Sequence, residues 1–245
     1  MSTIIILGYG KMGRAVERVC QSRGLEDYQT LDSFEELQAL DIPEDSVVIE
    51  FTCAPDCLKN YKFLIEKNIP VVTGTTGWLA QEDEIRSLLE EKGGRFLYAA
   101  NFSIGVHLFW HVVEQAARIF NHQDKYDVYC HEVHHPHKAD SPSGTALHTA
   151  QILLDNIRRK TKLVSGDVQG PLAPELLHFA ASRGGYQFGE HTVTFDGPDD
   201  TITVQHHAKS REGFANGAVD CALWLRQHTR NGYLTINDYL EDILT

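Results

Sequence analysis

The chain has 245 residues, of which 42% are hydrophobic and 23% are charged, and its formal net charge is -12 at pH 7. This length and composition exclude a disordered or fibrous protein, and they allow one large hydrophobic core or two smaller ones. The excess of acidic residues argues against a nucleic acid as partner, because its phosphate backbone would be repelled.

The amino-terminal sequence and the cysteines predict the compartment. No basic stretch precedes the apolar run Ile4–Leu7, and this run is too short for a signal peptide or a membrane span. The five cysteines are odd in number and scattered through apolar segments, which favours free thiols over a disulfide framework. We expect a cytoplasmic protein that does not interact with membranes.

Short β-branched runs alternate with amphipathic stretches over the first hundred residues. This alternation predicts βαβ units on a doubly wound parallel sheet, an α/β fold of the Rossmann type. The predicted strands are Thr3–Leu7, Tyr28–Leu31, Val47–Phe51, Pro70–Thr73 and Arg95–Ala99. The predicted helices are Lys11–Arg23, a helix that starts at Ser33 with Glu36 completing a capping box, and Gln81–Lys92.

The pattern changes after Asn101 and predicts an α+β domain with an open mixed sheet. The predicted elements are a helix over Gly105–Phe120, a strand over Tyr126–His135, a helix over Thr145–Arg159, turn-rich segments, and strands over Glu190–Phe195 and Thr201–His206. A helix over Phe214–Gln227 and the tail to Thr245 follow, and we expect them to return to the first sheet.

A glycine-rich loop follows the first predicted strand and opens the first predicted helix. Gly8, Gly10 and Gly13 in GYGKMG have the order that the dinucleotide-binding fingerprint requires, although an ordinary glycine-rich turn is an alternative. The fingerprint also expects an acidic residue near the end of the second strand, which binds the ribose hydroxyls. Asp32, 24 positions after Gly8, is the candidate, and helix capping is its competing role.

Two further loops follow the predicted fourth and fifth strands, GTTG at residues 74–77 and AANFS at residues 99–103. Ligands of open α/β sheets bind at the carboxyl ends of the strands, so both loops are candidate sites for a nicotinamide ribose. Plain turn chemistry is the alternative interpretation.

Residues 131–146, HEVHHPHKADSPSGTA, contain the pattern H-E-x-x-H of zinc hydrolases at His131, Glu132 and His135. A zinc site of this kind needs both histidines on one face of a helix. The segment is instead rich in β-branched and aromatic residues, and Pro136 and Pro142 interrupt any helix through it. On a strand the two histidines lie about 13 Å apart at ~3.3 Å per residue, too far to share one ion.

The SPSGTA sequence precedes an apolar-periodic helix. The N–H groups at its start and the hydroxyls of Ser143 and Thr145 form a candidate site for an anion, with helix capping by Ser143 as an alternative or additional role. His134, His135 and Lys138 lie nearby in the sequence and supply the proton-donating or cationic groups that an anionic substrate needs. A surface histidine cluster without a role is the competing hypothesis.

The segment E-V-H-H-P-H-K-A-D-S-P-S-G-T-A, residues 132–146, resembles the signature E-x-H-H-x-x-K-x-D-x-P-S-G-T-A of the 4-hydroxy-tetrahydrodipicolinate (dihydrodipicolinate) reductases. The resemblance extends to GYGKMG, EFT at residues 50–52, GTTG, AANFSIGV, FGEHTV and AKSREGFANGA, and so to nearly the whole chain.

The resemblance implies a homotetrameric oxidoreductase of the diaminopimelate route to lysine, which reduces a cyclic dicarboxylate with NADH or NADPH and needs no metal. It implies catalysis by His134 and Lys138, and substrate binding by His135, Ser143, Gly144 and Thr145. The implied cofactor-binding residues are Gly8, Tyr9, Gly10, Lys11, Met12, Gly13, Asp32, Gly74, Thr75, Thr76, Ala99, Ala100, Asn101, Phe102 and Arg211. We therefore predict a dinucleotide-binding domain of residues 1–102 and 214–245, and a substrate-binding, catalytic and oligomerisation domain of residues 103–213.

Two positions depart from the family pattern. Lys11 stands where arginine is common, so the resemblance does not decide between NADH and NADPH, and Pro136 stands where arginine is common at a position without a catalytic role. Two other classes of function stay open at this point, a zinc hydrolase that uses His131, Glu132 and His135, and a non-catalytic module that senses NAD(P).

Overall fold

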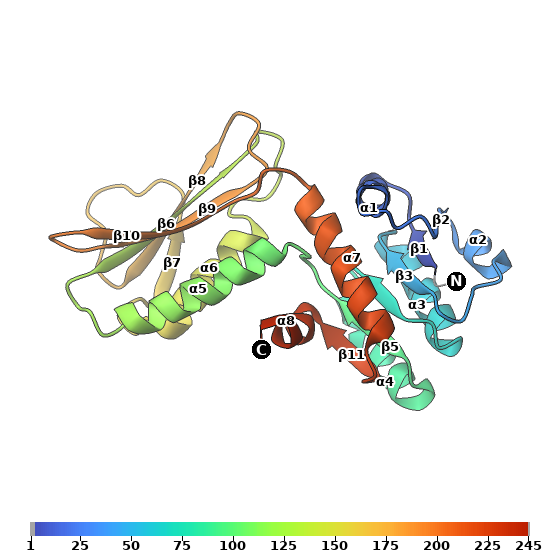
Figure 1. The fold of residues 1–245 in the computed structure, drawn as a ribbon. Helices are drawn as coiled ribbons and strands as arrows, with labels where there is room; N and C mark the ends of the chain where they lie inside the picture. The colour runs from blue at the N-terminus through green and yellow to red at the C-terminus, as the bar shows by residue number, and fades with distance from the viewer. Residues whose placement is uncertain (1–2, 245) are drawn as a thin grey trace. The chain divides into compact units, whose positions relative to one another are not determined.

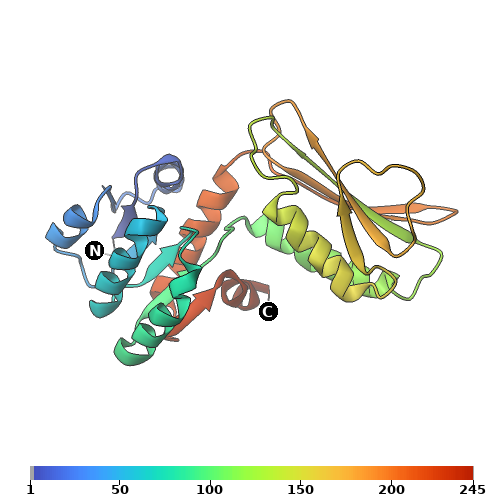
Figure 2. The ribbon, with the colours of Figure 1, turned by 180° about the vertical axis from the view of Figure 1, so that it is seen from behind.

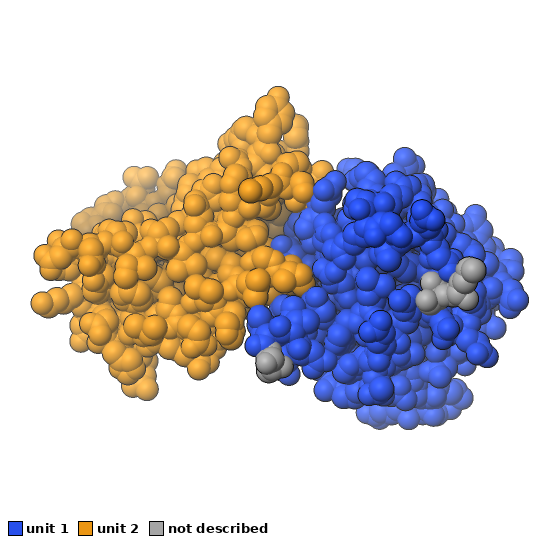
Figure 3. Space-filling view, in the orientation of Figure 1, with its two compact units in different colours: residues 1–103, 212–245 blue, residues 104–211 orange. Residues whose placement is uncertain are grey.

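The computed structural model describes residues 3–244 and divides the chain into two compact units, which Figure 3 shows in different colours. Unit 1 comprises residues 1–103 and 212–245, and unit 2 comprises residues 104–211. None of the helices among the described residues is long and apolar enough to cross a membrane.

Unit 1 is built on a six-stranded parallel sheet with the order β11-β5-β4-β3-β1-β2 (Figure 1). Its strands are β1 (Ile4–Leu7), β2 (Tyr28–Leu31), β3 (Val47–Glu50), β4 (Val71–Thr73), β5 (Arg95–Tyr98) and β11 (Gly232–Thr235). Strands β1, β3 and β4 are completely buried, which explains their continuous β-branched sequences.

Helices cover both faces of this sheet, as expected for a doubly wound fold. They are α1 (Lys11–Ser22), α2 (Phe34–Ala39), α3 (Ala54–Glu66), a 3₁₀ turn (Leu79–Gln81), α4 (Glu82–Lys92), α7 (Glu212–Gln227) and α8 (Ile236–Leu244). α1 packs against α7 and α3 packs against α4. Figure 2 shows unit 1 from behind. The largest buried side chains between α3, α4 and the sheet are Tyr61, Trp78 and Phe96, whose rings meet edge to face.

The predicted fold class of the first half is confirmed, but helix α3 was not predicted. α3 begins with Pro55 near its first turn and buries Tyr61, Leu64 and Ile65 at helical spacing. The tail does return to the first sheet, where β11 pairs with β5 as a sixth strand.

Unit 2 holds a five-stranded mixed sheet with the order β10-β9-β6-β8-β7. Its elements are α5 (Ile104–Phe120), β6 (Asp127–His134), α6 (Gly144–Asn156), β7 (Lys162–Ser165), β8 (Leu176–Arg183), β9 (Glu190–Asp196) and β10 (Thr201–His207). β6 pairs in parallel with β8 and antiparallel with β9, and α5 and α6 lie together along one side of the sheet (Figures 1 and 2).

The prediction of a mixed open sheet is confirmed, but the expectation of turns between α6 and Glu190 is wrong. β7 and β8 lie there and pair in parallel. β8 carries the alanines Ala180 and Ala181 and begins after a proline- and glycine-rich stretch, so its local sequence favours a strand only weakly. Its pairing with the central strand β6 supplies the missing stabilisation.

Candidate active site

The glycine loop between β1 and α1 fits an anion. Gly10 is the residue before the first turn of α1, no side chain caps this helix, and its first turn contains no acidic residue. The N–H groups at the start of α1 are therefore not capped by side chains, and together with the helix dipole they can bind an anion such as a phosphate group.

Two glycines of this loop are required by close packing. A Cβ on Gly8 would lie 2.5 Å from the Phe51 carbonyl oxygen, and one on Gly13 would lie 2.3 Å from the Gly8 carbonyl oxygen. Gly8 also has φ +92°, which a side chain rarely tolerates. These contacts fit the resemblance to a dinucleotide fingerprint better than an ordinary turn.

Phe51, in the loop after β3, contacts the loops that follow β1, β4 and β5. It lies directly beside Gly8, its ring would meet a Cβ on Gly74 at 2.2 Å, and it packs edge to face against Phe102 at 6.0 Å between centroids. The predicted cofactor-binding residues of GYGKMG, GTTG and AANF thus gather at the carboxyl ends of β1, β4 and β5. Thr76 and Ala100 are exposed there, and the Asn101 Oδ1 atom accepts a hydrogen bond from the Ser103 N–H at 2.8 Å.

Asp32 follows β2 and does not cap α2. Ser33 is the N-cap, since its Oγ accepts from the Glu36 N–H at 3.2 Å. The exposed Asp32 carboxylate instead accepts a hydrogen bond from the Tyr9 N–H of the glycine loop at 3.0 Å. It therefore lies beside the glycine loop, where an adenine ribose would extend from the pyrophosphate.

A second group of polar residues lies in unit 2 around Glu132, which is fully buried on β6. One carboxylate oxygen pairs with the Arg183 guanidinium at 2.9 Å, and the other accepts from the Ser143 hydroxyl at 2.5 Å. Burial opposes ionisation of Glu132, but the Ser143 hydrogen bonds and Arg183 outweigh it and lower its pKa below the usual value. Glu132 is therefore an anion with fixed partners.

His134 lies beside this carboxylate, with its Nδ1 atom 3.6 Å from Glu132 Oε2. The His191 ring from β9 packs edge to face against it at 5.2 Å between centroids, and a Cβ on Gly189 would lie 3.0 Å from its Nε2 atom. Burial lowers the pKa of His134 below 6.5 despite Glu132, with Lys138 and Arg183 contributing in the same direction. The imidazole is accordingly neutral at pH 7.

The start of α6 holds the remaining predicted substrate residues. Ser143 caps the helix by accepting from the Ala146 N–H at 3.1 Å, while its own N–H and hydroxyl face Glu132. Its donors are thus used within the protein, whereas Gly144 is exposed and Thr145 is half-buried. The Lys138 ammonium forms an ion pair with Asp140 at 2.7 Å, and Lys138 and the Gly144 N–H both lower the pKa of Asp140. A carboxylate therefore already faces the ammonium and the amino end of α6.

Two other predicted residues have clear positions. His135, beyond the end of β6, donates its N–H to the Gln187 carbonyl at 2.8 Å, and its ring Nδ1 atom is buried without a hydrogen-bond partner. Arg211 is the last residue of unit 2, and its guanidinium lies 5.6 Å from the Phe188 ring centroid.

The geometry speaks against the zinc hydrolase alternative. The H-E-x-x-H residues lie on a strand and its continuation, and His131 bonds Ser182 on the opposite side of the sheet from Glu132. Among the described residues a different group, Glu132, His134 and His191, brings three potential ligand atoms within 4.8 Å of one another. A metal ion there would lie next to the Arg183 guanidinium, so we interpret the group as a buried polar cluster around His134.

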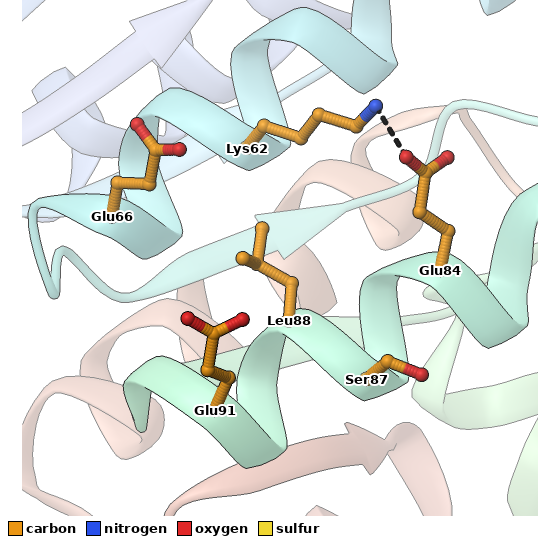
Figure 4. Close-up of a pocket in the computed structure, with 6 residues that line it drawn as sticks. All are labelled: Lys62, Glu66, Glu84, Ser87, Leu88 and Glu91. Carbon is orange, nitrogen blue, oxygen red and sulfur yellow. Dashed lines mark ion pairs between the residues drawn. The ribbon is translucent and has the colours of Figure 1, made fainter.

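A hollow between α3 and α4 offers no comparable chemistry (Figure 4). It is lined by Lys62, Glu66, Glu84, Ser87, Leu88 and Glu91. Lys62 and Glu84 pair across it at 2.6 Å with both side chains about half exposed, which is typical of a surface ion pair that links two helices.

No role was predicted from the sequence for His191, Arg183 or Glu50. His191 belongs to the FGEHTV segment, whose resemblance was noted without a residue role, and Arg183 comes from β8, which was not predicted. Glu132 was predicted only as part of the possible zinc motif and as the first residue of the family signature, without a structural role. The signal for these residues is their pairing across the sheet, which adjacent sequence does not reveal.

His191 predicts a measurable pH dependence of stability. Burial, and to a lesser extent the neighbouring His134 and His206, lower its pKa to about 4 although Glu132 opposes this. The folded-state pKa lies below the unfolded value of 6.5. The free energy of unfolding therefore decreases by about 3 kcal/mol as the pH falls from about 6.5 to about 4. We expect the free energy of unfolding of His191→Gln, measured by urea titration, to decrease over the same pH range by about 3 kcal/mol less than that of the unmodified chain.

The control is His122→Gln, at an exposed position of the same unit, which should keep the pH profile of the unmodified chain. Parallel profiles for His191→Gln and the unmodified chain would show that His191 does not carry this proton uptake.

A glycine loop on a doubly wound parallel sheet, together with a histidine and lysine site on a mixed-sheet unit, defines the class of two-domain dinucleotide-dependent oxidoreductases. Comparison with family models identifies the member. The model described as the dihydrodipicolinate reductase N-terminus matches residues 2–102, and the one described as its C-terminus matches residues 105–240. The chain belongs to the dihydrodipicolinate reductase family.

Individual relatives and one solved structure agree with this. The 4-hydroxy-tetrahydrodipicolinate reductase of Christiangramia forsetii is 36% identical over 241 residues, 98% of each chain, and that of Archaeoglobus fulgidus is 37% identical over 95% of this chain and 96% of its own. The dipicolinate-bound dihydrodipicolinate reductase from Paenisporosarcina sp. TG-14 has the same fold, with a TM-score of 0.71, 21% identity and coverage of 96% and 97%.

Proposed function

We propose that the chain reduces 4-hydroxy-tetrahydrodipicolinate to tetrahydrodipicolinate, with loss of water, in the diaminopimelate route to lysine. The observation that carries this is the family match over both halves of the chain. Supporting it, the loops of unit 1 fit a dinucleotide, and unit 2 combines a neutral buried histidine, a lysine and a helix start that fit an anionic substrate. Oxidation of NADH or NADPH that requires the cyclic substrate, measured as loss of nicotinamide absorbance, tests the proposal.

The reduced nicotinamide, when bound, supplies the hydride. Unit 2 supplies position and protons. The Gly144 and Thr145 N–H groups at the start of α6 and the Lys138 ammonium attract the substrate carboxylates, which compete with Asp140 for the same donors. Lys138 donates the proton to the substrate atom that gains electron density, and His134, which lies beside Glu132 and His191, assists as a neutral donor or acceptor.

For the cofactor we propose NADH, or dual use of NADH and NADPH, because of Asp32. An anionic carboxylate beside the glycine loop accepts hydrogen bonds from ribose hydroxyls and repels a 2′-phosphate. Asp32→Ala should therefore raise the KM for NADH and lower the KM for NADPH, as measured by steady-state kinetics with each nucleotide. Unchanged KM values for both would remove Asp32 from the cofactor site.

The start of α6 predicts a selective effect of Gly144→Pro. Gly144 is the first residue of the helix, a Cβ there meets no atom within 4 Å, and Ser143 already has the extended conformation that precedes proline. The substitution should preserve the helix but remove one N–H donor, raising the KM for substrate about tenfold with little effect on cofactor binding. Gly144→Ala keeps the N–H and serves as the control.

A change in cofactor affinity with an unchanged substrate KM would contradict the assignment of substrate binding to unit 2.

We also propose a cytoplasmic homotetramer, as the resemblance implies. Helices α5 and α6 lie on the same side of the mixed sheet of unit 2, which leaves the other side available for a second copy. Light scattering at about four times the 27.6 kDa of one chain checks the assembly.

A further inference from the structure

Unit 1 contains a second buried carboxylate, Glu50 at the end of β3, whose side chain is completely inaccessible. It accepts hydrogen bonds from the Thr52 N–H at 2.8 Å, the Tyr61 hydroxyl at 2.9 Å, the Thr73 hydroxyl at 2.6 Å and the Thr75 hydroxyl at 3.2 Å. The Thr52 hydroxyl is a further donor. Five donors from four residues therefore converge on one side chain.

The donors identify Glu50 as an anion without a cationic partner. All of them are neutral N–H or O–H groups, and within the described residues no ion pair includes Glu50, in contrast to Glu132 with Arg183. A buried carboxylate is costly and is tolerated here because every donor points to it. An apolar side chain at position 50 would cost less free energy than a buried carboxylate. The function of Glu50 must therefore lie in the donor groups that it holds in place.

Two of the residues that bond Glu50 belong to loops. Thr52 lies in the EFT loop after β3 (residues 50–52), and Thr75 lies in the GTTG loop after β4. The GTTG loop is further anchored because the Trp78 indole N–H donates to the Thr75 carbonyl at 2.8 Å and the Thr75 N–H reaches the Thr73 hydroxyl at 3.2 Å. Tyr61 holds the carboxylate from α3, away from the loops.

The strand order assigns these loops to one half of a dinucleotide. β1, which precedes the glycine loop, lies between β2 and β3. With the pyrophosphate over β1 and the adenine ribose toward Asp32 after β2, the nicotinamide half extends toward β3 and β4. Phe51 and Gly74 pack against each other at that position.

We propose that Glu50 is a positioning residue for the nicotinamide half of the cofactor, which holds the EFT and GTTG loops in their binding conformation without touching the nucleotide itself. The inference rests on the proposed function, because it needs a nicotinamide dinucleotide on unit 1. It adds a residue outside the glycine fingerprint that determines affinity for one half of that dinucleotide.

Glu50→Gln tests this when the affinities for two probes, NADH and ADP-ribose, are compared by titration calorimetry. Glutamine keeps the size of the side chain, but its neutral amide oxygen accepts more weakly than a carboxylate from the loop donors Thr52 and Thr75, and its NH₂ faces the Tyr61 and Thr73 hydroxyls. We expect the Kd for NADH to rise about tenfold, because one charge-assisted hydrogen bond contributes roughly this factor, and the Kd for ADP-ribose to stay unchanged. A general loss of folding would raise both.

Tyr61→Phe provides a second, milder variant, which carries the test if Glu50→Gln does not fold. It removes one donor to Glu50 from α3 and should weaken NADH binding severalfold without affecting ADP-ribose. The matched control is Tyr98→Phe, whose ring packs against the same Trp78 but whose hydroxyl does not bond Glu50. This control should bind both probes as the unmodified chain does.

Two results would contradict the role of Glu50 but leave the proposed function standing. The first is that folded Glu50→Gln and Tyr61→Phe variants bind NADH normally. The second is that these variants lose affinity for NADH and for ADP-ribose by the same factor. An unmodified chain that binds neither NADH nor NADPH would instead overturn the proposed function, and the role of Glu50 with it.

Discussion

Replacing Lys138 by methionine should lower kcat about a hundredfold or more while leaving the fold and cofactor binding intact. The ammonium lies 2.7 Å from Asp140 near the start of α6, where it can attract a carboxylate and donate the proton that hydride transfer requires. Methionine keeps a flexible apolar stem but has no proton to give. Steady-state kinetics with saturating cofactor measure the effect, and nucleotide titration shows whether cofactor binding is retained.

Lys162→Met, at an exposed position on β7 of the same unit, is the matched control and should leave kcat unchanged. His134→Ala should also lower kcat, and the double variant Lys138→Met/His134→Ala should lose less than the product of the two effects if the residues act as one unit. A Lys138→Met variant with normal kcat and substrate KM would show that this lysine is surface charge and that the proton comes from His134 or water.

Removing the Glu132 carboxylate should have the largest effect on stability. Glu132→Ala removes the ion-pair partner of the half-buried Arg183 guanidinium and the acceptor of the buried Ser143 N–H, and breaking such a buried pair typically costs about 3 to 5 kcal/mol. It also removes the group that faces the Nδ1 atom of His134, so kcat should fall as well. The free energy of unfolding from urea titration at pH 7 measures the first effect.

The control is Glu114→Ala, which breaks a more exposed ion pair with Arg118 on α5 and should cost less than about 1 kcal/mol. Glu132→Gln should restore part of the stability, since an amide oxygen can still accept from Ser143. A free energy of unfolding for Glu132→Ala that matches the control would show that the pairing with Arg183 contributes nothing to the fold.

Local sequence was sufficient to predict five of the six strands of the parallel sheet of unit 1, all except β11. Its central strands are buried on both faces and therefore read as continuous apolar runs, and Gly24 and Gly93 mark helix ends. The glycine loop and the SGTA helix start could also be predicted, because each is a contiguous motif whose chemistry depends on its own backbone.

The parts that escaped prediction depend on contacts between distant residues. β8 is a strand because it pairs with β6, and only that pairing brings Arg183 to Glu132. His191 reaches His134 across the β6 and β9 ladder, where Glu132 and His191 are directly paired. Glu50 was quoted as part of a motif, but its donors come from β4, α3 and two loops. Sequence patterns predict elements, whereas these networks arise only when the elements pack.

The transfer of an isotope label tests the central claim most directly. The purified chain is incubated with 4-hydroxy-tetrahydrodipicolinate and NADH that carries deuterium at the transferable position of the nicotinamide, and the products are analysed by mass spectrometry. We expect tetrahydrodipicolinate that contains one deuterium, in equal amount to the oxidised nucleotide formed. Oxidation of the nucleotide without labelled product, or no oxidation with either NADH or NADPH, would contradict the assignment of this chain as a reductase of that substrate.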